Sequence, residues 1–341
     1  MAKIDFIREL DKLKTPVWRV IQNYLPDKVP PGHYDMVREY PGRQGKYFRP
    51  GLVVLGTQLF GGDPRKAALT AAAMQTSEDW LLIHDDIEDH SEQRRHKPTL
   101  NRLHGDELAI NAGDALHIIM WKMLGENARL LHNEIGWKIF NKMSEVLLTA
   151  TEGQYLELQW IREKKVFVSQ DEYLDMVKRK TAFYTVIGPL QLGAILAGAT
   201  DREIRQIEDW GTPFGYAFQI WDDCMNISTP SEKQGKETGG DILEGKRTLI
   251  LSHLLAHCNQ KERRHIQDIY LKPRARKTKR DKDYVLRLMA TYGSIDHAKK
   301  IALEFGNRSK EIFDRRTAHL KNTKAKETIR AGIDFVTNRE Q

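Results

Sequence analysis

The stretch from residue 67 to residue 90 reads AALTAAAMQTSEDWLLIHDDIEDH, and it decides the fold class of this chain. Its apolar residues recur at three- and four-residue spacing, which predicts a buried α-helix rather than a strand. The stretch ends in acidic residues, Asp85 and Asp89 among them. At 100° per residue, these two carboxylates lie within about 40° of each other on one helix face. The pattern predicts a polar site built at the end of a core helix.

Four further segments carry the same helical pattern. They are rich in Ala, Leu, Met, Ile and Gln, with apolar residues at three- and four-residue spacing. Their ranges are 109–131, 137–161, 186–199 and 204–227. Alternating β-branched segments bounded by hairpin turns are essentially absent, and no internal repeat or long linker is visible. We therefore predict one all-α domain over residues 1–341, packed around central helices.

The composition excludes several classes of protein. Of the 341 residues, 40% are apolar, and 54 basic and 47 acidic side chains leave a formal charge of +7. A content of 24 Gly, 12 Pro and 2 Cys excludes collagen, low-complexity disorder and a disulfide scaffold. No apolar stretch approaches the roughly 20 residues of a membrane-spanning helix, and the charged start lacks a signal peptide. We expect a cytoplasmic protein without an integral membrane segment.

The densest basic cluster is the run KPRARKTKR at residues 272–280. Such a run is typical of a solvated loop, and a patch that binds a polyanion or a membrane surface is the alternative. The sequence has no zinc-finger spacing, no RNP-like aromatic motif and no Gly-rich RNA-clamping loop. Nucleic acid is therefore not an expected partner.

A second acidic pair interrupts another apolar helix. Asp222 and Asp223 directly follow the sequence YAFQIW at residues 216–221. Charged side chains are rarely buried without partners, and Mg²⁺ takes oxygen ligands, using one or two carboxylates plus substrate phosphates. Two such interruptions suggest facing helices with a metal between them. For either pair alone, a solvated acidic patch is the alternative.

Basic residues flank both acidic pairs. Arg binds phosphate oxygens through a bidentate fork and Lys supplies a point charge, so both suit a ligand that carries diphosphate. The cations concerned are Lys46, Arg49, Arg94, Arg95, Lys97, Lys180, Lys236 and Lys246. Each one alone is more typical of a solvated surface. Their conjunction with two acidic pairs predicts a metal-assisted diphosphate site.

These motifs resemble those of the trans-isoprenyl diphosphate synthases, the all-α polyprenyl synthetase family. The likeness runs from about Gly45 to Leu255. In the family's order stand Asp85-Asp-Ile-Glu-Asp89 with Arg94-Arg95, Gly113-Asp114, Lys180-Thr181, Gln219-Ile-Trp-Asp222-Asp223, Gly239-Gly-Asp241 and Glu244-Gly-Lys246-Arg-Thr-Leu. The resemblance implies a single helical bundle of the isoprenoid synthase type with a central apolar cavity, and it implies a homodimer.

The resemblance also implies a reaction. It is a Mg²⁺-dependent, head-to-tail condensation of isopentenyl diphosphate with an allylic diphosphate, namely dimethylallyl, geranyl or farnesyl diphosphate. Three Mg²⁺ ions would accompany the bound substrate, and Mn²⁺ could substitute. Geranylgeranyl diphosphate is the expected product, with farnesyl diphosphate as the alternative. A class I terpene cyclase and a non-catalytic subunit of a heteromeric prenyl synthase are the rival interpretations, although both acidic pairs are intact.

Roles follow from the resemblance position by position. The metal ligands would be Asp85, Asp89 and Asp222, with Asp86 and Asp223 supporting them. The residues that hold the allylic diphosphate would be Arg94, Lys180, Lys236 and Lys246. Those that hold isopentenyl diphosphate would be Lys46, Arg49 and Arg95. The residues near the developing carbocation would be Thr181 and Gln219.

Three positions depart from the family's pattern. Asn226 replaces the third aspartate of the second motif, but it can still orient a metal-bound water, so we expect activity to be retained. Tyr47 replaces a frequent basic residue. Glu78 stands where relatives offer His or Gln to the homoallylic diphosphate. A carboxylate there would repel the substrate unless a neighbouring Arg or Lys neutralises it.

Trp80 is the expected floor of the cavity. It stands before Asp85 by five positions, which is about 7.5 Å along a helix that rises ~1.5 Å per residue. Leu81 follows it, where farnesyl-producing eukaryotic relatives tend to have two adjacent aromatic residues, and the first motif lacks the insertion typical of bacterial farnesyl synthases. This combination is similar to that of archaeal geranylgeranyl diphosphate synthases. The alternative is that Trp80 simply belongs to the core.

Overall fold

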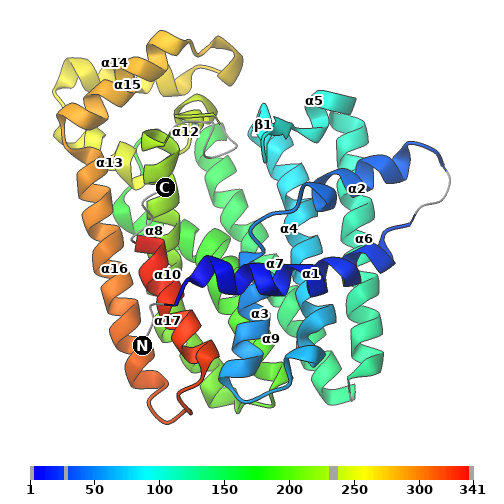
Figure 1. The fold of residues 1–341 in the computed structure, drawn as a ribbon. Coiled ribbons are helices and arrows are strands. Elements are labelled where there is room, and N and C mark those ends of the chain that lie inside the picture. The colour runs from blue at the N-terminus through cyan, green and yellow to red at the C-terminus, as the bar shows by residue number, and fades with distance from the viewer. Residues whose placement is uncertain (1–3, 27–29, 132, 230–236, 338–341) are drawn as a thin grey trace.

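Long α-helices dominate the computed structural model, which describes residues 4–26, 30–131, 133–229 and 237–337 (Figure 1). The first part of the chain forms α1 (Phe6–Tyr24), α2 (His33–Arg43), α3 (Phe48–Leu59), the 3₁₀ helix η1 (Pro64–Ala67), α4 (Ala68–Glu88), the short strands β1 (Gln93–Arg94) and β2 (Lys97–Pro98), α5 (Leu100–His104), α6 (Asp106–Leu130) and α7 (Asn133–Arg162). The predicted all-α class is confirmed.

The second part of the chain begins with a helix that changes its hydrogen-bond pattern. Its elements are α8 (Gln170–Val177), the π-helix η2 (Lys178–Ile187), α9 (Gly188–Leu196), α10 (Asp201–Ser228), α12 (Gly240–Glu244), α13 (Leu249–His257), α14 (Gln260–Leu271), the 3₁₀ helix η3 (Arg274–Arg276), α15 (Lys279–Thr291), α16 (Ser294–Arg316) and α17 (Lys324–Thr337). The five segments predicted from apolar spacing correspond to α4, α6, α7, the end of η2 with α9, and α10, and only residues 67, 89–90, 131 and 197–199 lie beyond the ends of these helices.

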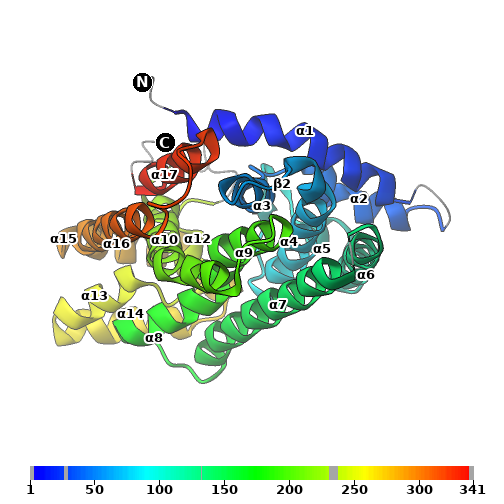
Figure 2. The same cartoon turned by 90° about the horizontal axis from the view of Figure 1, so that it is seen from below.

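The long helices run roughly parallel to one another, and α1 crosses them on one side (Figure 1). Seen from below, α3, α4, α9 and α10 lie in the middle, α6 and α7 form one edge, and α13, α14 and α16 lie on the other side (Figure 2). The main packing partners are α4 with α6, α3 with α9, and α10 with both η2 and α16. This arrangement places both acidic motifs on helices of the central group.

The core consists of two hydrophobic clusters that share α10. The larger cluster includes Trp210 and Phe214 of α10 and draws on the helices from α1 to α7, on η2 and α9, and on α16 and α17. The smaller one includes Ile220 and Ile227 of the same helix and draws on α7, α8 and the helices from α12 to α16. The single-domain organisation stays a prediction, which this shared helix supports.

Local signals explain where α10 begins. Thr200 is its N-cap, and the hydroxyl of Thr200 accepts a hydrogen bond from the Glu203 backbone while the Glu203 side chain accepts one from the Thr200 backbone. This reciprocal pair satisfies two donors that a helix start leaves open.

Among the described residues, no helix combines the length and the apolarity that crossing a bilayer would require.

The hairpin β1–β2 is a feature that the sequence pattern did not predict. Each strand has two residues, with Arg94 paired to Lys97, so there is no room for an alternating pattern. The turn residues Arg95 and His96 both have positive φ, 53° and 63°. This matches the mirror-image turn that fits the twist of a two-residue hairpin. The hairpin follows α4 directly and therefore lies beside the first acidic motif.

Candidate active site

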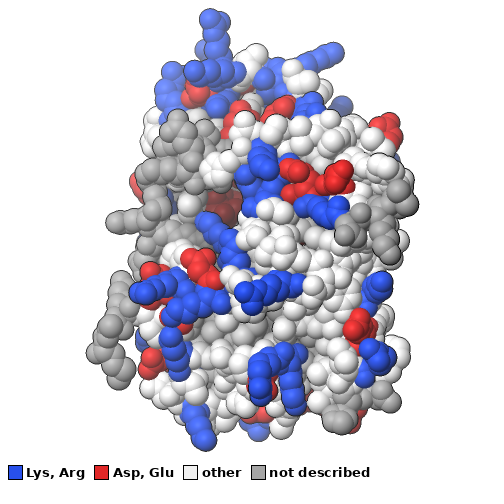
Figure 3. Space-filling view, turned by 45° about the vertical axis from the view of Figure 1, so that its right-hand side comes forward, with Lys and Arg blue, Asp and Glu red and all other residues white. Residues whose placement is uncertain are grey.

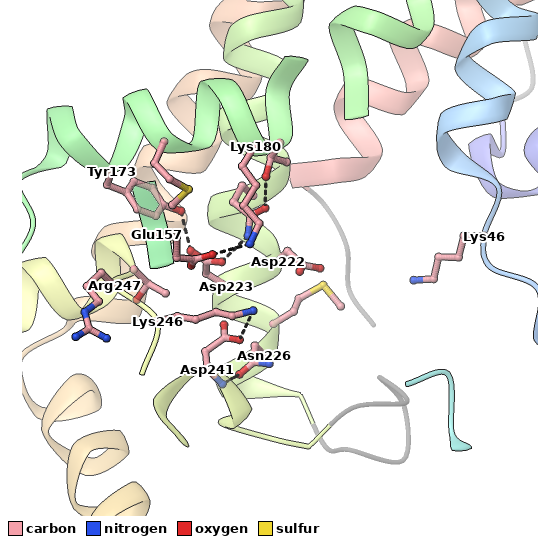
Figure 4. A pocket seen from close by; sticks show the side chains of 15 residues that line it. Lys46, Glu157, Tyr173, Lys180, Asp222, Asp223, Asn226, Asp241, Lys246 and Arg247 are labelled. Atoms are coloured by element: carbon pink, nitrogen blue, oxygen red, sulfur yellow. Dashed lines mark hydrogen bonds and ion pairs between the residues drawn. The ribbon is translucent and has the colours of Figure 1, made fainter. Parts of the chain in front are cut away.

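Two adjoining hollows lie among α4, α7, η2 and α10. The polar pocket, of about 160 Å³, is lined mainly by charged and amide side chains from α7, η2, α10 and the segment around α12 (Figure 4). The α4–α7 cavity, of about 390 Å³, adds apolar side chains from α4 and α7. The side chains that line both hollows are Lys180, Thr181, Gln219, Asp222 and Lys246. A ligand with a charged head and an apolar tail could therefore occupy both at once.

The first acidic motif lies at the C-terminal end of α4. Asp85 lies in the last turn and lines the α4–α7 cavity, and Asp89 is the C-cap residue. Between them, Asp86 is fully buried and accepts hydrogen bonds from Tyr40 Oη at 2.5 Å and from Arg94 Nε at 2.9 Å. Asp86 thus anchors the motif, and Asp85 and Asp89 are the carboxylates placed to bind a cation.

The hairpin supplies two basic residues to two different acidic groups. Arg94 Nη2 lies 3.2 Å from Asp85 Oδ2, and the same guanidinium contacts Asp86. Arg95 instead places Nη2 at 3.3 Å from Glu78 Oε1, further back on α4. The tight turn sends neighbouring side chains in different directions, which is why one arginine reaches the end of α4 and the other its middle.

The second acidic motif, on α10, repeats the division seen in the first. Asp222 is exposed and lines both hollows, whereas Asp223 is buried. Asp223 accepts hydrogen bonds from Tyr173 Oη and from Gln219 Nε2, both at 2.7 Å (Figure 4). Burial raises the pKa of Asp223 to about 7 despite these donors. Each motif therefore has one open aspartate followed by a buried one that a tyrosine hydroxyl holds.

Two lysines balance the charges of Asp85 and Asp89. Lys180 Nζ lies 3.5 Å from Asp85 Oδ1 and 2.5 Å from Glu157 Oε2. Lys246 Nζ lies 3.0 Å from Asp89 Oδ2. Burial acts to lower the pKa of both lysines, but the surrounding carboxylates outweigh it and raise each pKa above its ordinary value. Both ammonium groups therefore stay charged beside the pocket.

The π-helix η2 brings Lys180 and Thr181 against α7 and α10. A Cβ atom on Gly153 of α7 would lie 2.3 Å from the backbone nitrogen of Lys180, and one on Gly215 of α10 would lie 2.3 Å from Cα of Ala182. Glycine is required at both positions for the helices to approach so closely. Thr181 Oγ1 then donates to Gln219 Oε1 at 2.7 Å. Stretches of π-helix are frequent at functional sites.

A second group of basic residues surrounds Glu78, the residue that departs from the family's pattern. Glu78 Oε2 lies 3.1 Å from Arg49 Nη1, and Glu78 Oε1 lies 3.3 Å from Arg95 Nη2. Arg95 Nη1 also lies 3.0 Å from Oδ1 of the fully buried Asp79. The guanidinium of Arg49 stacks over the Tyr184 ring, 4.5 Å from its centroid. The carboxylate of Glu78 is therefore neutralised by two arginines.

The other residues expected near isopentenyl diphosphate are placed less closely together. Lys46 lines the polar pocket and lies across it from Asp222 and Lys246 (Figure 4). Tyr47 is buried with a positive φ of 53°, at the N-cap of α3. Lys236, expected to assist with the allylic diphosphate, lies outside the described residues.

Trp80 lines the α4–α7 cavity, and its role as the floor of that cavity stays a prediction. Its side chain is 8% exposed, and its ring packs on His117 of α6 with centroids 4.7 Å apart. His117 Nε2 in turn accepts a hydrogen bond from Trp121 Nε1 at 2.7 Å. The other apolar lining comes from Leu81, Leu82, Ala150, Leu158 and Phe218. The indole ring of Trp80 thus packs against His117 and also lines the cavity.

The donor set fits a hard divalent cation completed by a ligand. Burial raises the pKa of Asp89 to about 7, and in the described part of the chain its Oδ2 is a buried oxygen that accepts no well-aligned hydrogen bond. No three acidic, histidine or cysteine side chains among the described residues converge on one metal position. Mg²⁺ commonly takes one or two carboxylates and completes its shell with substrate phosphates. Open carboxylates on facing helices provide such a partial set.

Several residues of the site were not expected from the sequence to act there. Glu157, a buried acid within α7, pairs with Lys180, and this pairing with lysines keeps its pKa low although burial acts to raise it. An acidic residue inside an apolar helix was the signal that could have identified it. Asn226, by contrast, was singled out from the sequence; its Oδ1 accepts a hydrogen bond from the backbone N–H of Asp241 at 3.2 Å, so it holds the start of α12. Tyr40 and Tyr173 carried no local signal.

Comparison with known proteins gives consistent similarities. The profile of the polyprenyl synthetase family matches residues 31–289. The geranylgeranyl diphosphate synthase of Sulfolobus acidocaldarius is 34% identical over 72% of this chain and 73% of its own length. That of Methanosarcina mazei is 30% identical over 92% of this chain and 93% of its own. The crystal structure of geranylgeranyl pyrophosphate synthetase from Pyrococcus horikoshii is 31% identical and superposes with a TM-score of 0.85 over 98% of this chain and 99% of its own.

Proposed function

We propose a specific reaction for this chain, which belongs to the polyprenyl synthetase family. The protein is a short-chain prenyltransferase that joins isopentenyl diphosphate head-to-tail to an allylic diphosphate, and its proposed product is geranylgeranyl diphosphate. One observation carries the proposal. The open carboxylates of α4 and α10, with Lys180 and Lys246 beside them, adjoin a cavity with apolar walls. This matches an allylic diphosphate, which has a charged head and an apolar tail.

The residues proposed to bind the diphosphate act on the bond that breaks. Lys180, Lys246 and Arg94 would hold the diphosphate of the allylic substrate and stabilise its charge as the C1–O bond breaks. Asp85, Asp89 and Asp222 would hold Mg²⁺, which would supply further positive charge to the leaving diphosphate. Preorganised positive charge of this kind costs no reorganisation when the bond breaks, so it stabilises the transition state more than the substrate.

The remaining steps need no nucleophilic side chain. The double bond of isopentenyl diphosphate attacks C1 of the allylic cation, and a proton then leaves to the departing diphosphate. Thr181 and Gln219, which line both hollows, would lie near the cation. Their mutual hydrogen bond of 2.7 Å fixes both side chains. The apolar walls formed by α4 and α7 would exclude water, which would otherwise trap the cation as an alcohol.

Isopentenyl diphosphate is proposed to bind at the basic group of Lys46, Arg49 and Arg95. Glu78 neutralises part of that charge, so the substrate would meet arginines that are already held in place.

We further propose a homodimer formed through the outer faces of α6 and α7. These faces expose large apolar side chains, including Ile118 at 67% and Leu148 at 63%. Sedimentation at micromolar concentration should give twice the mass of one chain, and a single-chain mass would overturn the dimer.

The decisive experiment is an incubation of the purified protein with Mg²⁺ and labelled isopentenyl diphosphate. Dimethylallyl, geranyl and farnesyl diphosphates are supplied in separate reactions, and the products are dephosphorylated and separated by chain length. We expect a C20 alcohol from each allylic substrate. Cyclic hydrocarbons formed without isopentenyl diphosphate would indicate a terpene cyclase instead. The absence of any product with all three partners would indicate a non-catalytic subunit.

A further inference from the structure

The basic run at residues 272–280 is not uniformly solvated. Figure 3 shows Lys and Arg side chains gathered at the top of the molecule, the end that α14, α15 and their connection form in Figure 1. Arg276, Lys279 and Arg280 are exposed there, as a solvated loop would predict. Arg274 and Lys277 instead are partly buried and turn toward the segment that contains α12. The run therefore has an outer and an inner set of cations.

Lys277 binds the end of α12. Its ammonium donates to the backbone carbonyl oxygens of Ile242 at 3.0 Å and of Leu243 at 2.9 Å. These carbonyls lie at a helix end, where intrahelical donors run out. A Cβ atom on Gly245, which has a φ of +82°, would lie only 2.9 Å from the same ammonium nitrogen. Lys277 therefore fixes the turn that leads from α12 to Lys246.

Arg274 binds one carboxylate that precedes α12 and one on the last residue of α12. Its Nη2 lies 3.0 Å from Glu237 Oε2, and its Nη1 lies 3.5 Å from Glu244 Oε1. The second oxygen of Glu244 lies 3.2 Å from Lys246 Nζ. Glu244 thus stands between a cation from outside the pocket and a cation inside it.

The charges continue from there to the first acidic motif. Lys246 Nζ lies 3.0 Å from Asp89 Oδ2, and Ser91, just after that motif, donates its hydroxyl to Glu244 Oε1 at 3.0 Å. A continuous series of contacts therefore runs from Arg274 through Glu244 and Lys246 to Asp89. Glu244 and Asp89 compete for the single ammonium of Lys246, with Asp241 Oδ1 further away at 3.9 Å.

We propose that Arg274 and Lys277 are positioning residues that hold α12 and neutralise Glu244, so that Lys246 stays available to the allylic diphosphate. The inference rests on the proposed function and extends it to residues outside both hollows. Without Arg274, Glu244 would lose one of the cations that balance its charge and would attract Lys246 more strongly, away from the substrate. Without Lys277, the turn before Lys246 would lose the group that fixes it. Both changes weaken the binding of the same substrate.

The test compares inner and outer cations of the same run. Arg274→Gln and Lys277→Met each remove one inner charge, and Arg276→Gln and Arg280→Gln remove one outer charge as matched controls. We expect the inner variants to raise KM for the allylic diphosphate about tenfold, as loss of a supporting partner commonly does, with KM for isopentenyl diphosphate unchanged. Arg274→Lys keeps a positive charge beside Glu244 and should therefore retain most of the affinity for the allylic diphosphate. Both controls should behave as wild type.

A double-mutant cycle tests whether Arg274 acts through Glu244. In a Glu244→Gln background, Arg274→Gln should have little further effect on KM, because its target charge is already absent. The inference is overturned if the inner variants match the outer controls, or if they raise both KM values equally along with a lower melting temperature. An inactive wild-type protein would instead overturn the proposed function, so the two failures can be told apart.

Discussion

Glu78 and Arg49 form an ion pair, with Oε2 of Glu78 3.1 Å from Nη1 of Arg49. The sequence raised two possibilities for this glutamate, repulsion of a substrate diphosphate or neutralisation by a neighbour. The geometry favours neutralisation, because Arg95 also contacts the same carboxylate. Glu78 therefore positions the two arginines that are proposed to bind isopentenyl diphosphate.

Replacing Glu78 by Gln should weaken the binding of isopentenyl diphosphate. The amide keeps one acceptor but loses the charge that holds both arginines, so KM should rise about fivefold, which corresponds to roughly 1 kcal/mol. KM for the allylic diphosphate serves as the internal control and should not change. Steady-state kinetics with each substrate varied in turn measure both constants. A fall in KM for isopentenyl diphosphate would support the repulsion interpretation instead.

The open aspartates, Asp85 and Asp222, should be essential to turnover. Asp85→Asn and Asp222→Asn each remove one charge that is proposed to hold Mg²⁺, and kcat should fall by about 10²–10³-fold or more. The fall should be accompanied by a higher Mg²⁺ requirement, measured by titrating the metal at saturating substrate. Asp171→Asn, an exposed residue of α8, is the matched control. Near-wild-type turnover in either motif variant would exclude the two-motif site.

The hydrogen bond that Tyr173 donates to the buried Asp223 should contribute to the free energy of unfolding. Tyr173 donates to Asp223 at 2.7 Å inside the protein. Tyr173→Phe leaves this buried carboxylate short of one donor, and the free energy of unfolding should fall by about 1.5–3 kcal/mol. Urea denaturation followed by circular dichroism measures the change. Tyr34→Phe, at a partly exposed position of α2, should have little effect, and equal stability losses in the two variants would argue against a specific role for the hydroxyl of Tyr173.

Asp79 should make the stability depend on pH in an unusual direction. Burial raises its pKa to about 6 from an ordinary value of 3.8. Between these values the folded state binds more protons than the unfolded state, so the stability contributed by this group falls as pH rises. Asp79→Asn removes the titration. Relative to wild type, the variant should therefore gain up to about 3 kcal/mol of stability between pH 4 and pH 7.

Unfolding free energies of both proteins at pH 4, 5, 6 and 7 test this prediction. The difference between them, rather than either curve alone, isolates Asp79, because other titrating groups contribute equally to both. A difference that stays constant over this range, or one that changes in favour of the wild type, would contradict a raised pKa. The hydrogen bonds that Arg95 makes elsewhere should keep the variant folded.

The sequence predicted the parts of the site whose signals are local. Asp85 and Asp222 interrupt apolar helices, and this contrast is visible within a few residues of each. The roles of Tyr40 and Tyr173 could not be predicted in this way, because their partners lie 46 and 50 residues away in the chain. Such hydrogen bonds depend on how helices pack, which no local pattern contains.

The inner and outer cations of the basic run illustrate the same limit. Arg274 and Arg276 have nearly identical sequence surroundings, yet one contacts Glu244 and the other is exposed. Only the position of α12 beneath the run separates them (Figure 1). Likewise, Gly153 and Gly215 allow α7 and α10 to lie close against the π-helix that carries Lys180, and these contacts join distant parts of the chain. Composition alone would predict an ordinary α-helix there.

Trp80 should set the length of the product. Its ring lines the α4–α7 cavity and rests on His117, so the growing chain should stop where it meets the indole. Trp80→Ala should open this floor and shift the products from C20 to longer chains, as measured by chromatography of the dephosphorylated prenols. Because removing a buried Trp costs about 3–5 kcal/mol, Trp80→Leu provides a milder variant that should lengthen the products less. Leu303→Ala, at an exposed position of α16 outside both hollows, is the control and should leave the distribution unchanged. Active Trp80 variants that still stop at the wild-type length would show that this side chain belongs to the core and does not limit elongation.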